Sequence, residues 1–233
     1  MSLIPNHREM PEFVPGDIAA ERESRMAFLR RPDDSVINRF HEAVLHLDDP
    51  VARHGLLRAW EYAQSLDYHH PGQSKAVYLA HPLRVTTLYM QLFQPVDEPG
   101  VMTAILHNVM EVTNVRSSEL APVVGREIAE AVLILTVDRE RQWDDDYKRS
   151  YYFKIENSRG YVPRVKILDK LDNLFLLCLN PSEEIREKYL REIEAWLIPM
   201  AQRVAPQLAG YLSALVQDNR RVGHSPLHAV HNH

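Results

Sequence analysis

Apolar residues recur at three- and four-residue spacing along almost the whole chain, and this helical period restricts the fold more than any other feature. The alternation of apolar and polar residues between turn signals, which is typical of strands, is absent. The sequence therefore predicts an all-α protein, a bundle of many helices of moderate length. The segments expected to be helical are 17–30, 34–47, 51–66, 82–93, 98–113, 115–125, 125–136, 160–178, 182–202 and 204–220, with a charged, aromatic segment at 143–158.

Two helix starts carry local signals. Asp34 or Ser35 is suited to cap the second helix, because a short polar side chain there can accept a hydrogen bond from a free backbone amide. Pro82 suits the first turn of its helix, where a missing amide costs nothing. This interpretation places His81 at the entrance of that helix.

The chain has 233 residues, of which 45% are hydrophobic, and this is enough for one domain with a sizeable core. We expect that domain to be a single helical unit at residues 17–220. Residues 1–16 hold three prolines and little periodicity, which predicts an extended N-terminal arm. Residues 221–233 hold four histidines and are expected to be a disordered tail, although such histidines also bind metals adventitiously.

Charge and cysteine content narrow the cellular setting. The net charge of −5 argues against a nucleic-acid surface but leaves room for a local basic pocket. The single cysteine, Cys178, excludes an internal disulfide framework and suits a reducing compartment. No apolar run reaches the roughly 20 residues of a membrane helix, and the N-terminus is unlike a secretory signal. We therefore expect a cytoplasmic protein that binds neither nucleic acid nor membrane.

The helix expected at 98–113 carries polar residues beside its apolar side. At about 100° per residue, the apolar residues between 101 and 112 gather on one arc, with Asn108 at its edge. His107 and Glu111, four residues apart, lie just beyond it on the same flank. These groups would face a crevice between helices. Taken alone they are weak evidence for chemistry, because a single histidine there is more often a hydrogen-bonded core residue.

Two other segments favour a metal site. His81 stands at a helix entrance and Asp169 lies near the edge of its helix's apolar arc, and both could meet His107 at one metal. Imidazole and carboxylate groups are ligands for Mn, Fe, Zn or Co. Three lysines stand near these residues and are suited to hold phosphate, although a single lysine is more often a solvated surface residue: Lys75, Lys166 and Lys170.

Five segments in order resemble the motifs of the HD superfamily of metal-dependent phosphohydrolases. Within it, they are similar to the hydrolase domain of RelA/SpoT proteins and to the small stand-alone alarmone hydrolases. The resemblance covers residues 70–176. The segments are "HPGQSK", "VYLAHPLRV", "AILHNVMEVT", "VGREIAEAVLILTVD" and "RVKILDKLDNL".

The resemblance implies a role for each matching residue. His81, His107 and Asp169 would be metal ligands, with weak help from Asn108, and Glu111 would orient or deprotonate a water. The cofactor implied is a divalent metal, with Mn expected and Fe, Zn, Co or Mg as alternatives. The implied partner is a phosphorylated nucleotide, guanosine 3′-diphosphate 5′-diphosphate, which would lose pyrophosphate from its 3′ position. The residues expected to contact it are Lys75, Lys166, Lys170 and Asn173.

This sequence departs from the family pattern at three places. Asn108 stands where the family has an aspartate, and so offers a metal a dipole instead of a full charge. Val112 replaces a second aspartate and can handle no proton. The stretch between Gln73 and His81 lacks a loop that resembles part of a nucleotide-recognition element. Two hypotheses stay open: an active phosphohydrolase, or a degenerate HD domain that binds a nucleotide or a protein without turnover.

Two further interpretations belong to the C-terminal half. Asp172 lies one helical turn from Asp169, so it is a candidate substitute ligand. The segment 187–216 is amphipathic, and its apolar side would pack either on the domain's own core or on a second copy in a homodimer.

Overall fold

The computed structural model describes residues 16–68 and 74–227, and within them it contains helices and loops but no strand. The expected N-terminal arm, apart from Gly16, and the first part of the "HPGQSK" segment lie outside the described residues. The helices are α1 (Ile18–Arg30), α2 (Ser35–Leu45), α3 (Pro50–Ser65), α4 (Lys75–Leu92), α5 (Glu98–Leu106), α6 (Val109–Val112), α7 (Ser117–Val124), α8 (Arg126–Leu135), α9 (Asp145–Glu156), α10 (Tyr161–Leu176), α11 (Glu183–Glu192), α12 (Ile198–Val204) and α13 (Pro206–Val222). The all-α prediction is confirmed.

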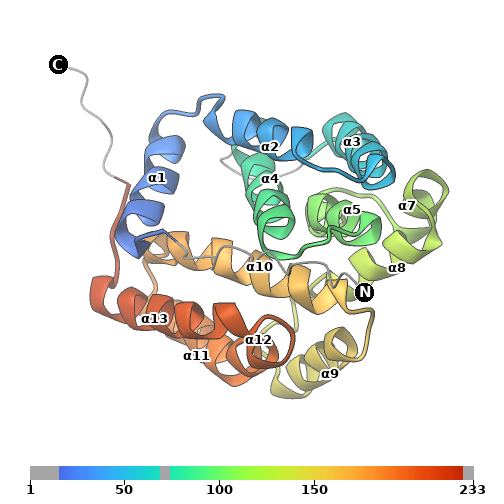
Figure 1. Ribbon diagram of the computed structural model, residues 1–233. Helices are drawn as coiled ribbons and strands as arrows, with labels where there is room; N and C mark the ends of the chain where they lie inside the picture. Colours follow the sequence, from blue (N-terminus) through green and yellow to red (C-terminus); the bar gives the residue numbers. More distant parts are fainter. Residues whose placement is uncertain (1–15, 69–73, 228–233) are drawn as a thin grey trace, which may run out of the picture.

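Helix α10 runs through the middle of the molecule, with other helices above and below it in this view (Figure 1). It packs against α1, α4 and α5 above it in this view and against α9, α12 and α13 below it. Most of its residues are buried, including charged ones such as Lys166 and Asp169. A helix in this position brings its side chains to a point that α4 and α5 also reach.

The helix starts follow local capping chemistry. Asp17, Asp49, Asp97 and Asp144 each accept a hydrogen bond from a first-turn amide of the following helix. Asp34 occupies the cap position of α2, as one of the two expected residues, but its side chain makes no capping bond there. These caps fix the helix ends that the apolar pattern left approximate.

Helix α4 begins seven residues before the position we expected. Ser74 caps it by accepting from Val77 N, and the helix continues through Pro82 to Leu92. His81 therefore lies inside α4 and not at its entrance, so that expectation is wrong. Proline forfeits one i→i−4 hydrogen bond in mid-helix, but the cap and the buried residues on both sides of Pro82 hold the helix together.

The helix expected at 98–113 is broken after Leu106. The imidazole Nδ1 of His107 donates to Ala104 O at 2.8 Å, and Asn108 adopts φ −112° and ψ 1°. In an uninterrupted helix, that carbonyl would accept from the amide of residue 108. The side chain of His107 thus competes with the helix, and α6 begins after a two-residue turn at 107–108.

The C-terminal region contains a second interruption and a last helix that ends later than expected. The segment 182–202 is divided into α11, a π-helical turn at Ile193–Leu197 and α12, with Pro199 in the first turn of α12. Because Pro199 has no amide to donate, the regular bonding cannot run through this point. Helix α13 extends to Val222, two residues into the expected tail, and Ser225 N donates to Cys178 O at 2.8 Å. Residues 228–233 lie outside the described residues.

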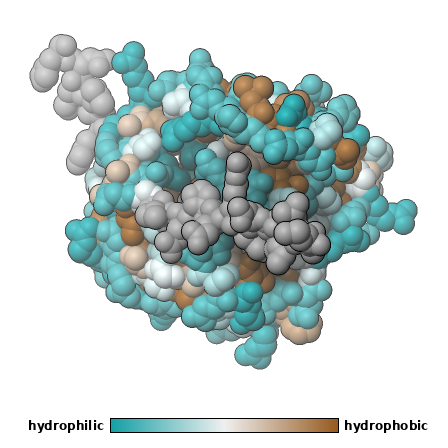
Figure 2. Space-filling model, in the orientation of Figure 1, coloured by the Kyte–Doolittle hydropathy of each residue, from teal (hydrophilic) through white to brown (hydrophobic). Residues whose placement is uncertain are grey.

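One connected hydrophobic core includes side chains from α1 to α13. The apolar residues of segment 187–216 belong to it, since Leu190, Leu197, Leu208 and Leu212 are buried. Packing on the chain's own core therefore accounts for that amphipathic pattern. The face shown in Figure 2 is mostly hydrophilic, with hydrophobic side chains in small separate groups. Over the described residues, no helix combines the length and the apolar character that a membrane crossing needs.

Candidate metal centre and active-site pocket

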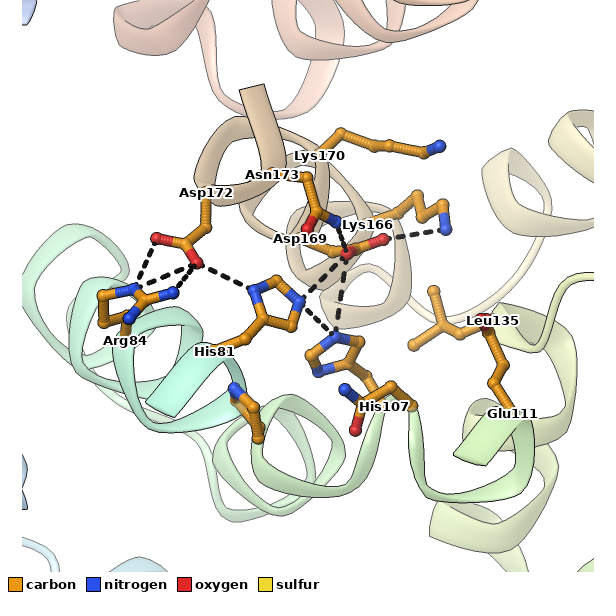
Figure 3. Close-up of polar contacts among 12 residues, drawn as sticks. His81, Arg84, His107, Glu111, Leu135, Lys166, Asp169, Lys170, Asp172 and Asn173 are labelled. Carbon is orange, nitrogen blue, oxygen red and sulfur yellow. Dashed lines mark hydrogen bonds and ion pairs between the residues drawn. The ribbon is translucent and has the colours of Figure 1, made fainter. Parts of the chain in front are cut away.

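Three expected metal ligands converge between α4, α5 and α10 (Figure 3). His81 Nε2 lies 3.1 Å from His107 Nε2 and 3.2 Å from Asp169 Oδ1. His107 Nε2 lies 3.7 Å from the same carboxylate oxygen. All three ligand atoms fall within 4.8 Å of one another, so two imidazoles and a carboxylate address one point.

The other ring nitrogen of each histidine is already engaged. His81 Nδ1 lies 2.8 Å from Asp172 Oδ2, and His107 Nδ1 lies 2.8 Å from Ala104 O. Since both acceptors require a proton on Nδ1, the Nε2 atoms are the ones left to present lone pairs. Two such lone pairs at 3.1 Å repel one another unless a positive charge lies with them. The donor set therefore fits a cation of the kind that imidazole and carboxylate ligands hold.

The protonation equilibria show the same demand for positive charge. Burial lowers the pKa of His81, but hydrogen bonds to Asp169 and Asp172 outweigh it and raise the pKa to about 9. Burial dominates for His107, whose pKa is lowered to about 4. At neutral pH, His81 thus carries a second ring proton and a positive charge, whereas His107 is neutral. A bound divalent cation would take the place of that proton.

Asp169 is kept ionised by the positive groups and hydrogen-bond donors around it. Burial raises the pKa of a carboxyl, but Lys166 and the two histidines outweigh it and keep the pKa of Asp169 well below its usual range. Lys166 Nζ lies 2.8 Å from Oδ2, and Asn173 Nδ2 donates to Oδ1 at 2.7 Å. Both residues, expected to contact substrate, therefore lie in the site and orient the ligand carboxylate.

Asn108 is buried beside this group. Its Nδ2 donates to the hydroxyl of Tyr78 at 3.0 Å, while its Oδ1 is buried without a hydrogen-bond partner among the described residues. An unsatisfied buried carbonyl oxygen is costly, so its presence calls for an explanation. A cation held by the neighbouring ligands would supply the missing partner.

Glu111 lies to one side of the ligand group, near Leu135 (Figure 3). Its Oε1 accepts from Val137 N at 3.1 Å, and its Oε2 lies 2.5 Å from Arg139 Nη2. The side chain is 9% exposed, whereas that of Arg139 is 66% exposed. The loop after α8 thus fixes the carboxylate that the sequence singled out, in a direction the helical wheel did not show.

The remaining two lysines have structural partners. Lys170 Nζ pairs with Glu192 Oε1 at 2.9 Å on the side of α11. Lys75 donates to the carbonyls of Gln64 and Leu66, at 2.8 Å for the latter, and closes the chain between α3 and α4. Lys170 lines the cleft described next, whereas Lys75 does not line it.

The ligand group opens into a cleft of about 690 Å³, which is large enough for a nucleotide. Its wall combines aromatic rings, which can stack on a base, with cations, which can bind phosphate. Tyr189 contributes a buried hydroxyl that has no hydrogen-bond partner within the described part of the chain. The aromatic and cationic side chains of the wall are Tyr78, Trp143, Tyr147, Tyr151, Tyr152, Tyr189, Arg84, Arg139, Lys148, Lys166 and Lys170.

Several of these residues were not found from the sequence. Arg139 follows directly after the "VGREIAEAVLILTVD" segment, while Tyr189 and Arg84 lie in segments that the sequence pattern singled out, but none of the three was given a role from the sequence. Asp172 was noted only as a substitute ligand, but it binds the far nitrogen of His81 and lies outside the convergent group. The signal available for Arg84 was its spacing of three residues from His81, which puts both on one side of α4.

Comparisons with known proteins agree with the motifs. No family model matches the chain. The guanosine-3′,5′-bis(diphosphate) 3′-pyrophosphohydrolase of Borreliella burgdorferi is 26% identical over 178 residues, which is 72% of this chain and 26% of that protein. The Drosophila melanogaster guanosine-3′,5′-bis(diphosphate) 3′-pyrophosphohydrolase MESH1 is 28% identical over 116 residues, which is 48% of this chain and 64% of that protein. The chain thus spans about a quarter of the bacterial relative.

A solved structure supports the fold. The structure of a metazoan ortholog of SpoT, described as hydrolyzing ppGpp, matches 73% of this chain and 96% of its own, with a TM-score of 0.57 and 21% identity. At that identity the match shows the shared helical fold. The sequence similarity to these relatives and the shared helical fold agree with the motifs, and all three make this chain similar to the guanosine-3′,5′-bis(diphosphate) 3′-pyrophosphohydrolases.

Proposed function

We propose that the protein is a metal-dependent phosphohydrolase that removes pyrophosphate from the 3′ position of guanosine 3′-diphosphate 5′-diphosphate. The observation that carries this proposal is the convergence of His81, His107 and Asp169 at the head of a cleft with aromatic and cationic walls. The names of the relatives supply the substrate. The shared ligand chemistry supplies the reaction class.

The proposed metal ligands are His81 Nε2, His107 Nε2 and an Asp169 oxygen, with the unpartnered Oδ1 of Asn108 as a fourth. Because Asn108 is neutral, this set carries a single negative charge. We expect Mn²⁺, with Fe, Zn, Co or Mg as alternatives. When bound, such an ion would act as a Lewis acid and lower the pKa of water.

Glu111 is the proposed proton acceptor for the attacking water. Its carboxylate lines the same cleft, and its contacts with Val137 N and Arg139 leave it in one orientation. A general base must reach the proton in the reactive complex, and a fixed carboxylate satisfies that need at a smaller entropic cost. Val112 also lines the cleft, so no second acid stands beside Glu111.

The substrate phosphates are proposed to meet the cationic wall. Lys166 and Lys170 are mostly buried and line the cleft, so phosphate oxygens there would meet positive charge away from bulk water. Asn173 and Lys75 are the remaining proposed contacts.

The alternative is a degenerate HD domain that binds a nucleotide or protein without turnover. Asn108 and Val112 favour it, because each replaces a carboxylate with a group that cannot take up a proton. The hydrogen bonds at Nδ1 of His81 and His107 favour the active enzyme, because they leave Nε2 of both rings to bind a metal. We further propose that the protein is cytoplasmic, that its partner is a nucleotide, and that it binds neither nucleic acid nor membrane. Light scattering would show whether it forms a homodimer.

The deciding experiment measures pyrophosphate release from guanosine 3′-diphosphate 5′-diphosphate with Mn²⁺. Wild type, His107→Ala and Asn108→Asp are compared. Release by the wild type that is lost in His107→Ala supports the proposal. If the wild type releases no pyrophosphate but Asn108→Asp does, the protein is a hydrolase inactivated at one ligand position. If neither releases pyrophosphate, this substrate is rejected.

A further inference from the structure

A second carboxylate stands behind His81, on the side of the ring away from the proposed metal. Asp172 Oδ2 lies 2.8 Å from His81 Nδ1, and the side chain of Asp172 is 1% exposed. Asp169 and Asp172 are one turn apart on α10, so the imidazole of His81 lies between them (Figure 3). The ring is thereby held at both nitrogens by one helix.

Two arginines saturate Asp172. Arg84 Nε lies 2.9 Å from Oδ1 and Arg84 Nη2 lies 2.9 Å from Oδ2, which is a bidentate pair. Arg25 Nε donates to Oδ1 at 2.8 Å. With the His81 contact, both carboxylate oxygens are fully engaged. Asp172 is therefore not free to turn toward the proposed metal.

Arg25 is itself fixed from α1. Its Nη1 bonds to the side chain and the carbonyl of Glu21, and its guanidinium lies 4.0 Å from the ring centre of Phe175. The charges of Asp172 and Glu21 offset those of Arg25 and Arg84, which makes burial of the network tolerable. A neutral, fully bonded network of this kind holds one geometry.

We propose that Asp172, held by Arg84 and Arg25, is a positioning residue for the metal site. It keeps the Nδ1 proton of His81 in place, so that Nε2 presents its lone pair to the ion, and it strengthens that nitrogen as a donor. The inference rests on the proposed function only in taking His81 as a metal ligand. It matters here because Asn108 brings no charge to the ligand set, so the histidines must bind well.

Isothermal titration with Mn²⁺ alone tests this without any substrate. Asp172→Asn keeps the shape of the side chain but cannot accept from three partners, and loss of such a supporting residue typically weakens metal binding by 10–100-fold. We expect the Kd for Mn²⁺ to rise by roughly that factor. Asp218→Asn is the matched control. Asp218 also pairs with two arginines, Arg22 and Arg221, but it lies on α13, away from the proposed ligands in the sequence, and does not line the cleft.

A spectrum separates positioning from general destabilisation. At saturating Co²⁺, a turned His81 changes the visible absorption of the bound ion in Asp172→Asn, whereas Asp218→Asn keeps the wild-type spectrum even if its Tm falls. A folded Asp172→Asn protein with wild-type Mn²⁺ affinity and Co²⁺ spectrum overturns the proposal.

Arg84→Gln serves if Asp172→Asn does not fold. It removes the bidentate clamp but leaves Asp172 and Arg25, so a several-fold loss of Mn²⁺ affinity is expected and an unchanged Kd is contrary evidence. A wild type that binds no Mn²⁺ or Co²⁺ overturns this proposal together with the proposed metal site. Asp172-dependent Mn²⁺ binding without hydrolysis of the guanosine substrate supports it while rejecting the proposed function.

Discussion

At the scale of single residues, the two histidines of the proposed metal site differ in what lies behind each ring. A carboxylate stands behind His81 and a backbone carbonyl behind His107. Hydrogen bonds to two carboxylates overcome burial and raise the pKa of His81 to about 9, whereas burial lowers that of His107 to about 4. The two rings of one site are thus in different protonation states at neutral pH.

Metal binding should consequently release a proton from His81. At pH 7, Mn²⁺ has to displace that proton, so about one proton should appear in the buffer for each ion bound. The sign follows directly: protons compete with the ion below the raised pKa, so binding weakens as pH falls from 9 toward 6. Titration calorimetry in two buffers of different ionisation enthalpy measures the release. Identical heats in both buffers would contradict the expectation.

Arg139→Ala should lower turnover without changing metal affinity. Arg139 holds one oxygen of Glu111, and its removal leaves that carboxylate with a single backbone contact. Loss of orientation of a general base should cost roughly tenfold in kcat, a fraction of what acid–base catalysis supplies. Arg141→Ala is the control, because Arg141 pairs with Asp144 in the same region. A kcat equal to that of the wild type would remove Arg139 from the mechanism.

At the scale of secondary-structure elements, the site depends on how closely α4 and α5 approach. Tyr89 of α4 donates to Asp97, which also caps α5 by accepting from Gly100 N at 2.7 Å. A Cβ at residue 100 would collide with the Tyr89 hydroxyl and with Asp97. Gly100 is therefore required by close contact between α4, which carries His81, and α5, which ends just before His107.

Gly100→Ala should destabilise the protein by about 1–3 kcal/mol, which is the usual cost of overpacking a closed site. Gly210→Ala is the matched control in α13, because a Cβ there meets nothing within 4 Å. That substitution should stabilise by about 0.5–1 kcal/mol through helix propensity. Urea unfolding of both variants measures the change in the free energy of unfolding, which should fall for Gly100→Ala and rise for Gly210→Ala. Equal effects would show that the approach of α4 and α5 is looser than the contacts imply.

At the scale of the whole molecule, the site joins segments far apart in sequence. His81 in α4, His107 at the end of α5 and Asp169 in α10 come from helices that pack on one another, and Asp172 adds α1 through Arg25. An ion bound at this point would bind the folded chain and not the unfolded one. Ligation therefore couples to global stability.

Mn²⁺ should raise the thermal midpoint of the wild type. At a free concentration about 100 times Kd, the gain should approach ~2.7 kcal/mol, and a chelator should reverse it. His107→Ala should show little or no gain because one of three ligands is gone. Differential scanning calorimetry with and without Mn²⁺ gives the comparison. A gain in His107→Ala equal to that of the wild type would place the ion elsewhere.

The helical class and the candidate ligand residues were accessible from the sequence, because both depend on local patterns. Helical spacing is a property of neighbours along the chain, and the histidines, Asp169 and Glu111 stand in recognisable short segments. Helix α4 was harder, because Pro82 suggested a start where Ser74 and the buried neighbours carry the helix through. The break at His107 also escaped, since a side chain bonding its own backbone leaves no trace in periodicity.

What the sequence by itself determined was therefore the fold class and a short set of chemically competent side chains. Only the tertiary structure decided which atoms meet. It put Asp172 behind His81, gave Arg139 to Glu111 and tied Lys75 to the end of α3. The physical reason is that a charged side chain takes its partner across helices, at a distance set by packing. No spacing along the chain encodes that distance.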